Sequence, residues 1–151
     1  MTVALDHIAV QTDDYDNTVA WYKAYFDCEA TWDRTFETLP RGIQERMPMC
    51  TRLVELQVGD IRFHVFDIKE GHTLPEASAL QYQHFGVMVD TRERLYAMRD
   101  KWIRLYQSGR FRFKSTEQPS DYIPSPGEML CFYAKDPNGL EFEVIHIAVS
   151  A

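Results

Sequence analysis

The sequence DHIAVQTDD at residues 6–14 recurs in altered form as QHFGVMVDT at residues 83–91. In each copy a histidine, His7 or His84, begins a run in which large apolar residues alternate with small or polar ones. This alternation is typical of a half-buried β-strand. The two histidines therefore hold equivalent positions, and we expect them to point the same way from their sheets.

Each copy leads into a segment with helical periodicity, at residues 14–26 and 91–109, and the second ends at Gly109. Apolar and aromatic side chains fall on one stripe of each segment, which predicts that they pack in the core. These stripes are Val19, Tyr22 and Phe26 in the first segment and Leu95, Met98, Trp102 and Leu105 in the second.

A second pair of matching segments lies farther along the chain, GDIRFHVFD at residues 59–67 and NGLEFEVIH at residues 138–146. A turn and an apolar, strand-like run precede each of them. The alignment makes His64 equivalent to Glu143, and Arg62 equivalent to Glu141.

This internal repeat predicts an α+β fold made of two tandem βαβββ modules. We expect the modules to form a cupped, mixed β-sheet with the helices on the outside. The chain is then a single domain, 1–151, with modules at about 1–69 and 81–151. The connector at 70–80, EGHTLPEASAL, contains Gly and Pro and few large apolar residues.

Composition excludes several classes of protein. The formal net charge is -7 and the pI is near 5.2, which argues against a nucleic-acid partner. Asp6 and His7 break the first apolar run, so we expect neither a leader nor a membrane-spanning helix. Three separated cysteines without a C-x-x-C motif favour a reducing, cytoplasmic location.

Imidazole or carboxylate groups recur at equivalent strand positions, on the face that we expect to be interior. There an unpaired polar group costs several kcal/mol. One divalent cation would satisfy all the groups at once, and three nitrogens with one oxygen suit Zn, Fe, Co, Ni or Mn better than Ca or Mg. The predicted metal ligands are His7, His64, His84 and Glu143.

Two further residues face the same side as the predicted ligands. Arg62 and Glu141 form either a cross-strand ion pair at the mouth of the cup or two functional groups, with Arg62 binding an anionic substrate and Glu141 transferring protons. His146 is out of phase with Glu143 and is expected on the outer face, and His72 falls in the connector.

The chain resembles the vicinal oxygen chelate superfamily, which includes glyoxalase I, methylmalonyl-CoA epimerase, extradiol dioxygenases and fosfomycin- and bleomycin-resistance proteins. The resemblance covers nearly the whole chain and extends to the closing segment GEMLCFYAKDPNGLEFEVIHI. It implies ligands at His7, His84 and Glu143. At the fourth position glyoxalase I-like members have Glu and methylmalonyl-CoA epimerases have Gln, so His64 departs from the pattern and is not a carboxylate base.

The resemblance implies that two neighbouring substrate oxygens chelate the metal, which acidifies the carbon next to a carbonyl. We expect an epimerase or isomerase of a small α-hydroxy-carbonyl compound, acting through an enediolate, with the 2-epi-5-epi-valiolone epimerase type and its cyclic sugar-derived ketone as the most specific candidate. Glu143 and Glu141 are the predicted catalytic residues, Glu55 is a more remote alternative, and Arg62 and Tyr133 are the predicted substrate-binding residues.

Four alternatives remain open at this point. They are a glyoxalase-like lyase, an extradiol-type dioxygenase, a thiol transferase of the fosfomycin-resistance kind and a drug-binding resistance protein without catalysis. The dioxygenase pattern expects an upstream histidine where this chain has Pro124, Ser125 and Pro126. The expected partners are a small-molecule substrate and, by analogy with the superfamily, a second copy of the chain in a homodimer.

Overall fold

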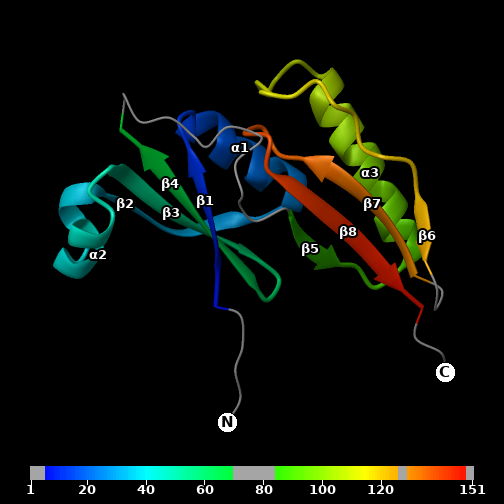
Figure 1. The fold of residues 1–151 in the computed structure, drawn as a ribbon, viewed down its shortest axis with the longest axis horizontal. Coiled ribbons are helices and arrows are strands. Elements are labelled where there is room, and N and C mark those ends of the chain that lie inside the picture. The colour runs from blue at the N-terminus through cyan, green and yellow to red at the C-terminus, as the bar shows by residue number, and fades with distance from the viewer. Residues whose placement is uncertain (1–5, 70–83, 126–128, 149–151) are drawn as a thin grey trace, which may run out of the picture. The chain divides into compact units, whose positions relative to one another are not determined.

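A computed structural model describes residues 6–69, 84–125 and 129–148 of the chain. The chain divides into two compact units, Met1–Ala79 and Leu80–Ala151, and each is described by itself. The predicted connector, 70–80, lies outside the described residues. Figure 1 colours the first unit from blue to green and the second from green to red.

Unit 1 begins with a strand and a helix, and a longer antiparallel part follows. Its elements are, in chain order, β1 (Ile8–Thr12), α1 (Tyr15–Phe26), β2 (Glu29–Thr35), the 3-10 turn η1 (Phe36–Thr38), α2 (Arg41–Arg46), β3 (Cys50–Val58) and β4 (Ile61–Ile68).

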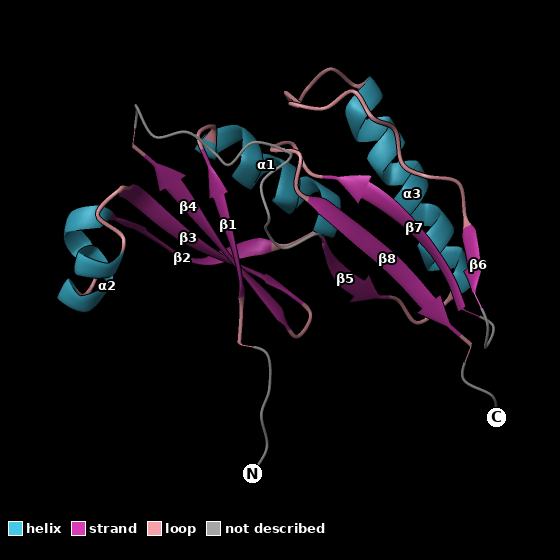
Figure 2. Cartoon of the chain, viewed as in Figure 1, coloured by secondary structure: helices cyan, strands magenta, loops and turns pink. Residues whose placement is uncertain are grey.

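The four strands of unit 1 form one sheet in the order β1-β4-β3-β2. β1 runs parallel to β4, whereas β3 is antiparallel to both β4 and β2. Alternate side chains of β4, such as Phe63 and Val65, are fully buried. Phe63 packs against Tyr22 of α1 with ring centroids 5.1 Å apart. Helix α1 therefore covers one face of this sheet (Figure 2), and the other face carries His64.

The segment between β2 and β3 forms η1 and α2, which sequence reasoning did not anticipate. Its Leu39 is buried and joins Cys50, Leu53 and Phe66 in a small apolar cluster. Leu53 and Phe66 are cross-strand neighbours in the β3–β4 ladder. They lie an even number of residues from Glu55 and His64, so the cluster occupies the same sheet face as His64.

Unit 2 repeats this order with a longer helix and no counterpart of α2 within the described residues. Its elements are β5 (His84–Met88), α3 (Arg92–Gln107), β6 (Ile123–Ser125), β7 (Met129–Lys135) and β8 (Glu141–Ile147).

The strands of unit 2 form a sheet in the order β5-β8-β7-β6, with β5 parallel to β8. Helix α3 starts where the Thr91 hydroxyl accepts a hydrogen bond from the Arg94 backbone N–H at 3.1 Å. It ends before Gly109, whose φ of 65° suits a left-handed helix terminus. The buried Trp102 of α3 donates from Nε1 to the Lys135 carbonyl at 2.9 Å, which ties α3 to β7.

The two units confirm the predicted α+β fold of tandem βαβββ modules. Each module forms its own open, four-stranded mixed sheet with a helix on one face. Of the predicted helical stripes, Tyr22, Leu95 and Trp102 are buried, as expected for core residues. The three cysteines are buried free thiols, and none of the described helices is long and apolar enough to cross a membrane.

Candidate functional site

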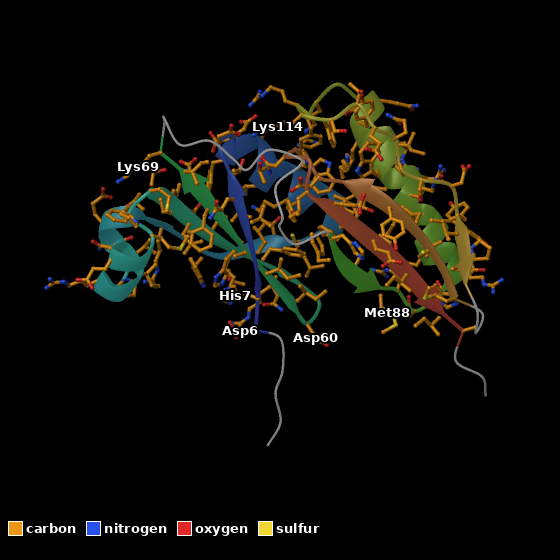
Figure 3. All side chains as sticks on the ribbon, in the orientation of Figure 1. Asp6, His7, Asp60, Lys69, Met88 and Lys114 are labelled. Atoms are coloured by element: carbon orange, nitrogen blue, oxygen red, sulfur yellow. The ribbon has the colours of Figure 1, made fainter. Side chains whose placement is uncertain are left out.

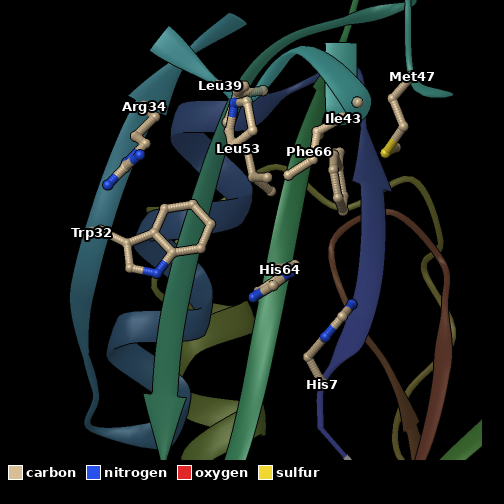
Figure 4. A pocket seen from close by; sticks show the side chains of 11 residues that line it. His7, Trp32, Arg34, Leu39, Ile43, Met47, Leu53, His64 and Phe66 are labelled. Carbon is tan, nitrogen blue, oxygen red and sulfur yellow. The ribbon is translucent and has the colours of Figure 1, made fainter. Parts of the chain in front are cut away.

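Two predicted ligands, His7 and His64, lie against each other in unit 1 (Figure 4). Their ring centroids are 3.9 Å apart and their planes meet at 18°, so the imidazoles are stacked. The contact follows from strand register, because Ala9 of β1 lies opposite His64 of β4. His7 precedes Ala9 by two residues and so faces the same side of the sheet.

Each of these histidines uses one ring nitrogen to contact a carboxylate. Nδ1 of His7 is 2.7 Å from Oδ2 of Asp6, and Nε2 of His64 is 2.9 Å from Oε2 of Glu55. Metal-binding histidines commonly donate their second N–H to a carboxylate in this way, which fixes the tautomer and the ring orientation. Nε2 of His7 and Nδ1 of His64 are then the nitrogens that could bind a metal.

The carboxylate behind His64 is itself enclosed. Glu55 is only 7% exposed, accepts a hydrogen bond from the Thr31 hydroxyl at 2.5 Å and lies 3.6 Å from Nη1 of Arg62. Burial favours the neutral acid, but the hydrogen bonds from Thr31 and His64 outweigh it and lower the pKa of Glu55. Burial, with the nearby His7, lowers the pKa of His64 despite the bond to Glu55. A lowered pKa favours the neutral imidazole, which is the form that binds metals.

Arg62, a predicted substrate-binding residue, is held within unit 1 by two carboxylates. Its Nη2 pairs with the Asp6 carboxylate, its Nε donates to the Asp6 carbonyl at 3.1 Å, and its Nη1 faces Glu55. Figure 3 shows Asp6 and His7 at the same end of the sheet as Asp60 in the β3–β4 turn. The charge of Arg62 is therefore largely balanced before any anion arrives.

The other two predicted ligands, His84 and Glu143, meet in unit 2. Nε2 of His84 is 3.5 Å from Oε2 of Glu143. The register repeats that of unit 1, since Gly86, two residues after His84, lies opposite Glu143. Two atoms bound to one tetrahedral zinc ion lie about 3.4 Å apart, given the usual Zn–N and Zn–O bond lengths. The spacing of His84 and Glu143 therefore fits two ligands of one metal.

Glu141 and Tyr133 complete the surroundings of His84. Nδ1 of His84 is buried and has no hydrogen-bond partner among the described residues, and Oε1 of Glu141 lies 3.8 Å from it. The Tyr133 ring stands edge-on to His84, with centroids 5.2 Å apart. Burial, followed by a hydrogen bond to Glu143, raises the pKa of Tyr133. Both predicted functional residues thus lie beside the His84–Glu143 pair.

The structure adds one equivalence that sequence comparison missed. Glu55 lies opposite His64 in the β3–β4 ladder, and Tyr133 lies opposite Glu143 in the β7–β8 ladder. The length of the β3–β4 turn could have predicted from the sequence that Glu55 lies opposite His64. A two-residue turn pairs Val58 with Ile61, and counting back along the strands pairs residue 55 with residue 64.

His146, the remaining described histidine, takes no part in either pair. His146 lies out of phase with Glu143, as predicted, but it is buried rather than exposed, and its Nδ1 lies 3.3 Å from the Val89 carbonyl. His72 lies outside the described residues. No group of three or more His, Cys, Asp or Glu side chains in the described ranges has a geometry that could hold a metal. The four-residue ligand set therefore stays a prediction, and each unit contributes one of its pairs.

An apolar pocket of about 530 Å³ opens beside the His7–His64 pair, entirely within unit 1 (Figure 4). The two imidazoles line it together with Trp32 of β2, whose ring stands edge-on to His64 at 5.3 Å between centroids. The remaining lining comes from β2, β3, β4 and the segment containing α2; its larger side chains include Leu39, Ile43, Met47, Leu53 and Phe66.

Comparisons with known proteins agree with this fold. The glyoxylase/bleomycin resistance protein/dioxygenase domain from Frankia sp. EAN1pec has a TM-score of 0.70 at 14% identity, over 98% of this chain and 100% of that one. Lactoylglutathione lyase from Agrobacterium tumefaciens has a TM-score of 0.62 at 20% identity, over 96% and 94%. The fosfomycin resistance protein FosX from Listeria monocytogenes, complexed with Mn(II) and sulfate, has a TM-score of 0.62 at 14% identity, over 99% and 96%.

At these identities the structural likeness shows the fold. A sequence comparison with curated proteins gives no match. A family model, however, matches residues 4–144, which include all four predicted ligands. The chain therefore belongs to the Glyoxalase/Bleomycin resistance protein/Dioxygenase superfamily, as its motifs predicted.

Proposed function

We propose that this chain is a divalent-metal-dependent enzyme that acts on a small α-hydroxy-carbonyl compound. The proposed metal ligands are His7, His64, His84 and Glu143. The observation that carries the proposal is that His7 and His64 each have a carboxylate within hydrogen-bond distance of one ring nitrogen, at 2.7 Å and 2.9 Å, while Glu141 lies 3.8 Å from the buried Nδ1 of His84. Such carboxylates orient ligand histidines and raise their basicity.

The donor set of three imidazoles and one carboxylate suits a transition metal such as Zn, Ni, Co, Mn or Fe. Membership of the superfamily supports a metal, since the FosX protein with the same fold is complexed with Mn(II). The 3.5 Å spacing of His84 and Glu143 supports the same conclusion, because it is longer than an ordinary N–H···O hydrogen bond and fits two ligands of one ion.

When bound, the metal supplies stabilisation of negative charge on two neighbouring substrate oxygens. We propose that Glu143 and Glu141 move the proton of the adjacent carbon. Tyr133 lies against Glu143 and keeps its phenol proton because burial raises its pKa, so it can donate a hydrogen bond to a substrate oxygen. Arg62 is paired already, and its proposed contribution is to hold Asp6, and through it His7.

An epimerase or isomerase is the reaction that we propose first, because proton removal and return at one carbon needs only two acid–base groups near the chelated oxygens. A glyoxalase-like lyase uses the same elements, and a lactoylglutathione lyase shares the fold. The cyclic sugar-derived ketone named from the sequence is the finer proposal. The apolar lining beside His64 counts against a substrate that carries hydroxyls along its whole length.

A drug-binding resistance protein is the second candidate function. The observation that favours it is the pocket of about 530 Å³, which falls within the range of small-molecule sites. Sequestering a drug needs this pocket but not the paired imidazoles and carboxylates, so the metal content separates the two functions. We also propose that the chain works as a cytoplasmic homodimer, which equilibrium sedimentation can test.

Elemental analysis of the purified protein tests the proposed function first. Wild type is compared with His7→Ala and Glu143→Ala, each after reconstitution with Zn, Co, Ni, Mn or Fe(II). We expect about one equivalent of metal per chain in the wild type, following the single-ion site, and loss of metal in both variants. His146→Gln is the control, because His146 lies outside both pairs, and it should keep its metal.

Solvent deuterium uptake by α-hydroxy-ketones tests the chemistry on the metal-loaded protein. We expect uptake at the carbon next to the carbonyl with the wild type and with His146→Gln, and none with Glu143→Gln. If the protein takes up no metal under any of these conditions, the proposal of a metal-dependent enzyme is wrong and the drug-binding function replaces it.

A further inference from the structure

The pocket beside the His7–His64 pair has one wall that the repeat does not account for. Its sheet side consists of residues from β2, β3 and β4, among them Trp32 and Phe66. The opposite side comes from the segment of residues 36–47, which carries Ile43 on α2. Unit 2 has no corresponding helix between β6 and β7 within its described residues. This segment therefore adds a pocket wall to unit 1 that is not part of the βαβββ module common to both units.

The chemistry of the pocket differs sharply between its two ends. At one end are the two stacked imidazoles, which are polar and proposed to bind metal. The body between the sheet and α2 is lined by aliphatic and aromatic side chains with few hydrogen-bonding groups. Such a surface binds apolar groups and penalises hydroxyls that lose water without gaining a partner. The body of the pocket therefore matches an apolar part of a ligand whose polar end is at the histidines.

A cation marks the rim of the pocket. Arg34 of β2 belongs to the lining, and its guanidinium lies over the Trp32 ring, 5.9 Å from the centroid. Two other arginines of the sheet, Arg52 and Arg62, pair with Asp33 and Asp6. Arg34 forms no ion pair with any carboxylate in the part of the chain that the structure describes. An exposed, unbalanced guanidinium at the edge of an apolar pocket suits a carboxylate or another anionic substituent.

We propose that this pocket binds the non-reacting part of the substrate, an apolar ring or branched chain that ends in an anionic group. The apolar part lies between Trp32 and Ile43, the anion contacts Arg34, and the two oxygens lie at the histidines. The assignment to a substrate rests on the proposed function. The pocket itself does not, because its lining lies wholly in unit 1 and needs no metal.

Metal-free protein, prepared with a chelator, tests the pocket alone. The probes are 3-phenylpropionate and its uncharged analogue 3-phenylpropanol, and binding is measured by calorimetry and by tryptophan fluorescence. Trp32 should report binding, since Trp21 and Trp102 are both fully buried. We expect saturable binding of both probes. Arg34→Gln should weaken 3-phenylpropionate about tenfold and leave 3-phenylpropanol within about twofold.

A matched pair of variants locates the binding. Ile43 is 37% exposed in the pocket wall and Ile147 is 44% exposed in unit 2, so the change to aspartate endangers folding similarly little at both places. Ile43→Asp should weaken both probes at least about tenfold, whereas Ile147→Asp should not. Equal behaviour of the two variants would overturn the proposal.

Metal-loaded protein then distinguishes this inference from the proposed function. Acetohydroxamate and benzohydroxamate offer the same pair of neighbouring oxygens and differ in the apolar group. We expect benzohydroxamate to bind at least about tenfold more tightly, and Ile43→Asp to remove that advantage. Equal affinities would overturn the pocket assignment and leave the metal enzyme intact. Binding of 3-phenylpropionate by a protein that takes up no metal would overturn the proposed function and keep the pocket as a ligand site.

Discussion

Nε2 of His64 lies 2.9 Å from Oε2 of Glu55, its direct neighbour across the β3–β4 ladder. Because this contact occupies Nε2, only Nδ1 of His64 is left for a metal. The same carboxylate accepts a hydrogen bond from Thr31, so its position is fixed from the β2 side as well. The orientation of one proposed ligand is thus determined by the register of a single hairpin.

Replacing this carboxylate should weaken metal binding. In Glu55→Gln the negative charge behind His64 disappears, and we expect the affinity for Zn(II) to fall about 10- to 100-fold, as for other carboxylates behind ligand histidines. Competition with a chelating dye measures the affinity. Glu29→Gln is the control, since Glu29 is exposed and pairs only with Lys23 among the described residues. Equal affinities in both variants would show that Glu55 does not orient the site.

A methyl group added at Gly86 should disturb the His84–Glu143 pair. A Cβ there would lie 3.2 Å from Cδ1 of Ile145 and 3.9 Å from Oε2 of Glu143. We expect Gly86→Ala to displace the Ile145 side chain, to place a methyl group in van der Waals contact with the Glu143 carboxylate, to lower stability by about 1 kcal/mol and to weaken Zn(II) binding. Gly42→Ala is the matched control, because its Cβ would meet nothing within 4 Å. Urea unfolding and the dye competition report both effects, and unchanged zinc affinity in Gly86→Ala would contradict the expectation.

The turn that feeds β8 should depend on Asp136. This carboxylate is fully buried, and its Oδ1 accepts hydrogen bonds from the backbone N–H groups of Asn138 at 2.9 Å and Leu140 at 2.8 Å. Asp136→Ala leaves both donors without their acceptor and should cost about 2 kcal/mol or more of unfolding free energy in urea. Asp60→Ala changes the exposed turn of the other module and should stay within about 0.5 kcal/mol. Similar losses of unfolding free energy in the two variants would mean that the hydrogen bonds to Asp136 do not stabilise its turn.

Stability should fall at alkaline pH because of Cys28. Burial, then the nearby Glu29, raises the pKa of this thiol to about 11, from an ordinary value of 9.0. The folded chain then keeps a proton that the unfolded chain releases, so the stabilisation is complete below pH 9 and is lost as the pH rises through 11. Urea unfolding between pH 8 and 11 should show this decline in the wild type and a smaller one in Cys28→Ala. An identical slope in both proteins would exclude Cys28 as its source.

The repeated histidine strands were sufficient to predict the modules and the sheet faces. The repeat itself placed His7 with His84 and His64 with Glu143 as equivalents, whereas the contacts within each unit are His7 with His64 and His84 with Glu143. The strands were sufficient for the sheet faces because the alternation of apolar and polar residues in a strand has a period of two, so one buried face fixes the direction of every side chain. Thr12 and Phe63 are buried on the helix side, and the neighbouring Gln11 and His64 point away from it. Equivalence between modules then paired His64 with Glu143 from the sequence alone.

The pocket could not be predicted in the same way. Residues 36–49 read FETLPRGIQERMPM, in which Pro40, Gly42 and Pro48 interrupt any periodicity and indicate a loop. The short helix α2 forms because Leu39 packs against Leu53 and Phe66, which are distant in sequence. Tertiary contacts of this kind override local propensity. They are also what gives unit 1 a lining that unit 2 does not repeat in its described residues.

Matched positions in the two sheets carry His64 and Glu143, and their cross-strand neighbours are Glu55 and Tyr133. If the two modules were identical chains in a symmetric dimer, both positions would have to carry the same side chain. Joining the copies in one gene product removes that restriction, so each half can mutate without changing the other. Both halves keep the same parallel pairing of strands, β1 with β4 and β5 with β8, while the side chains at the matched positions differ in charge.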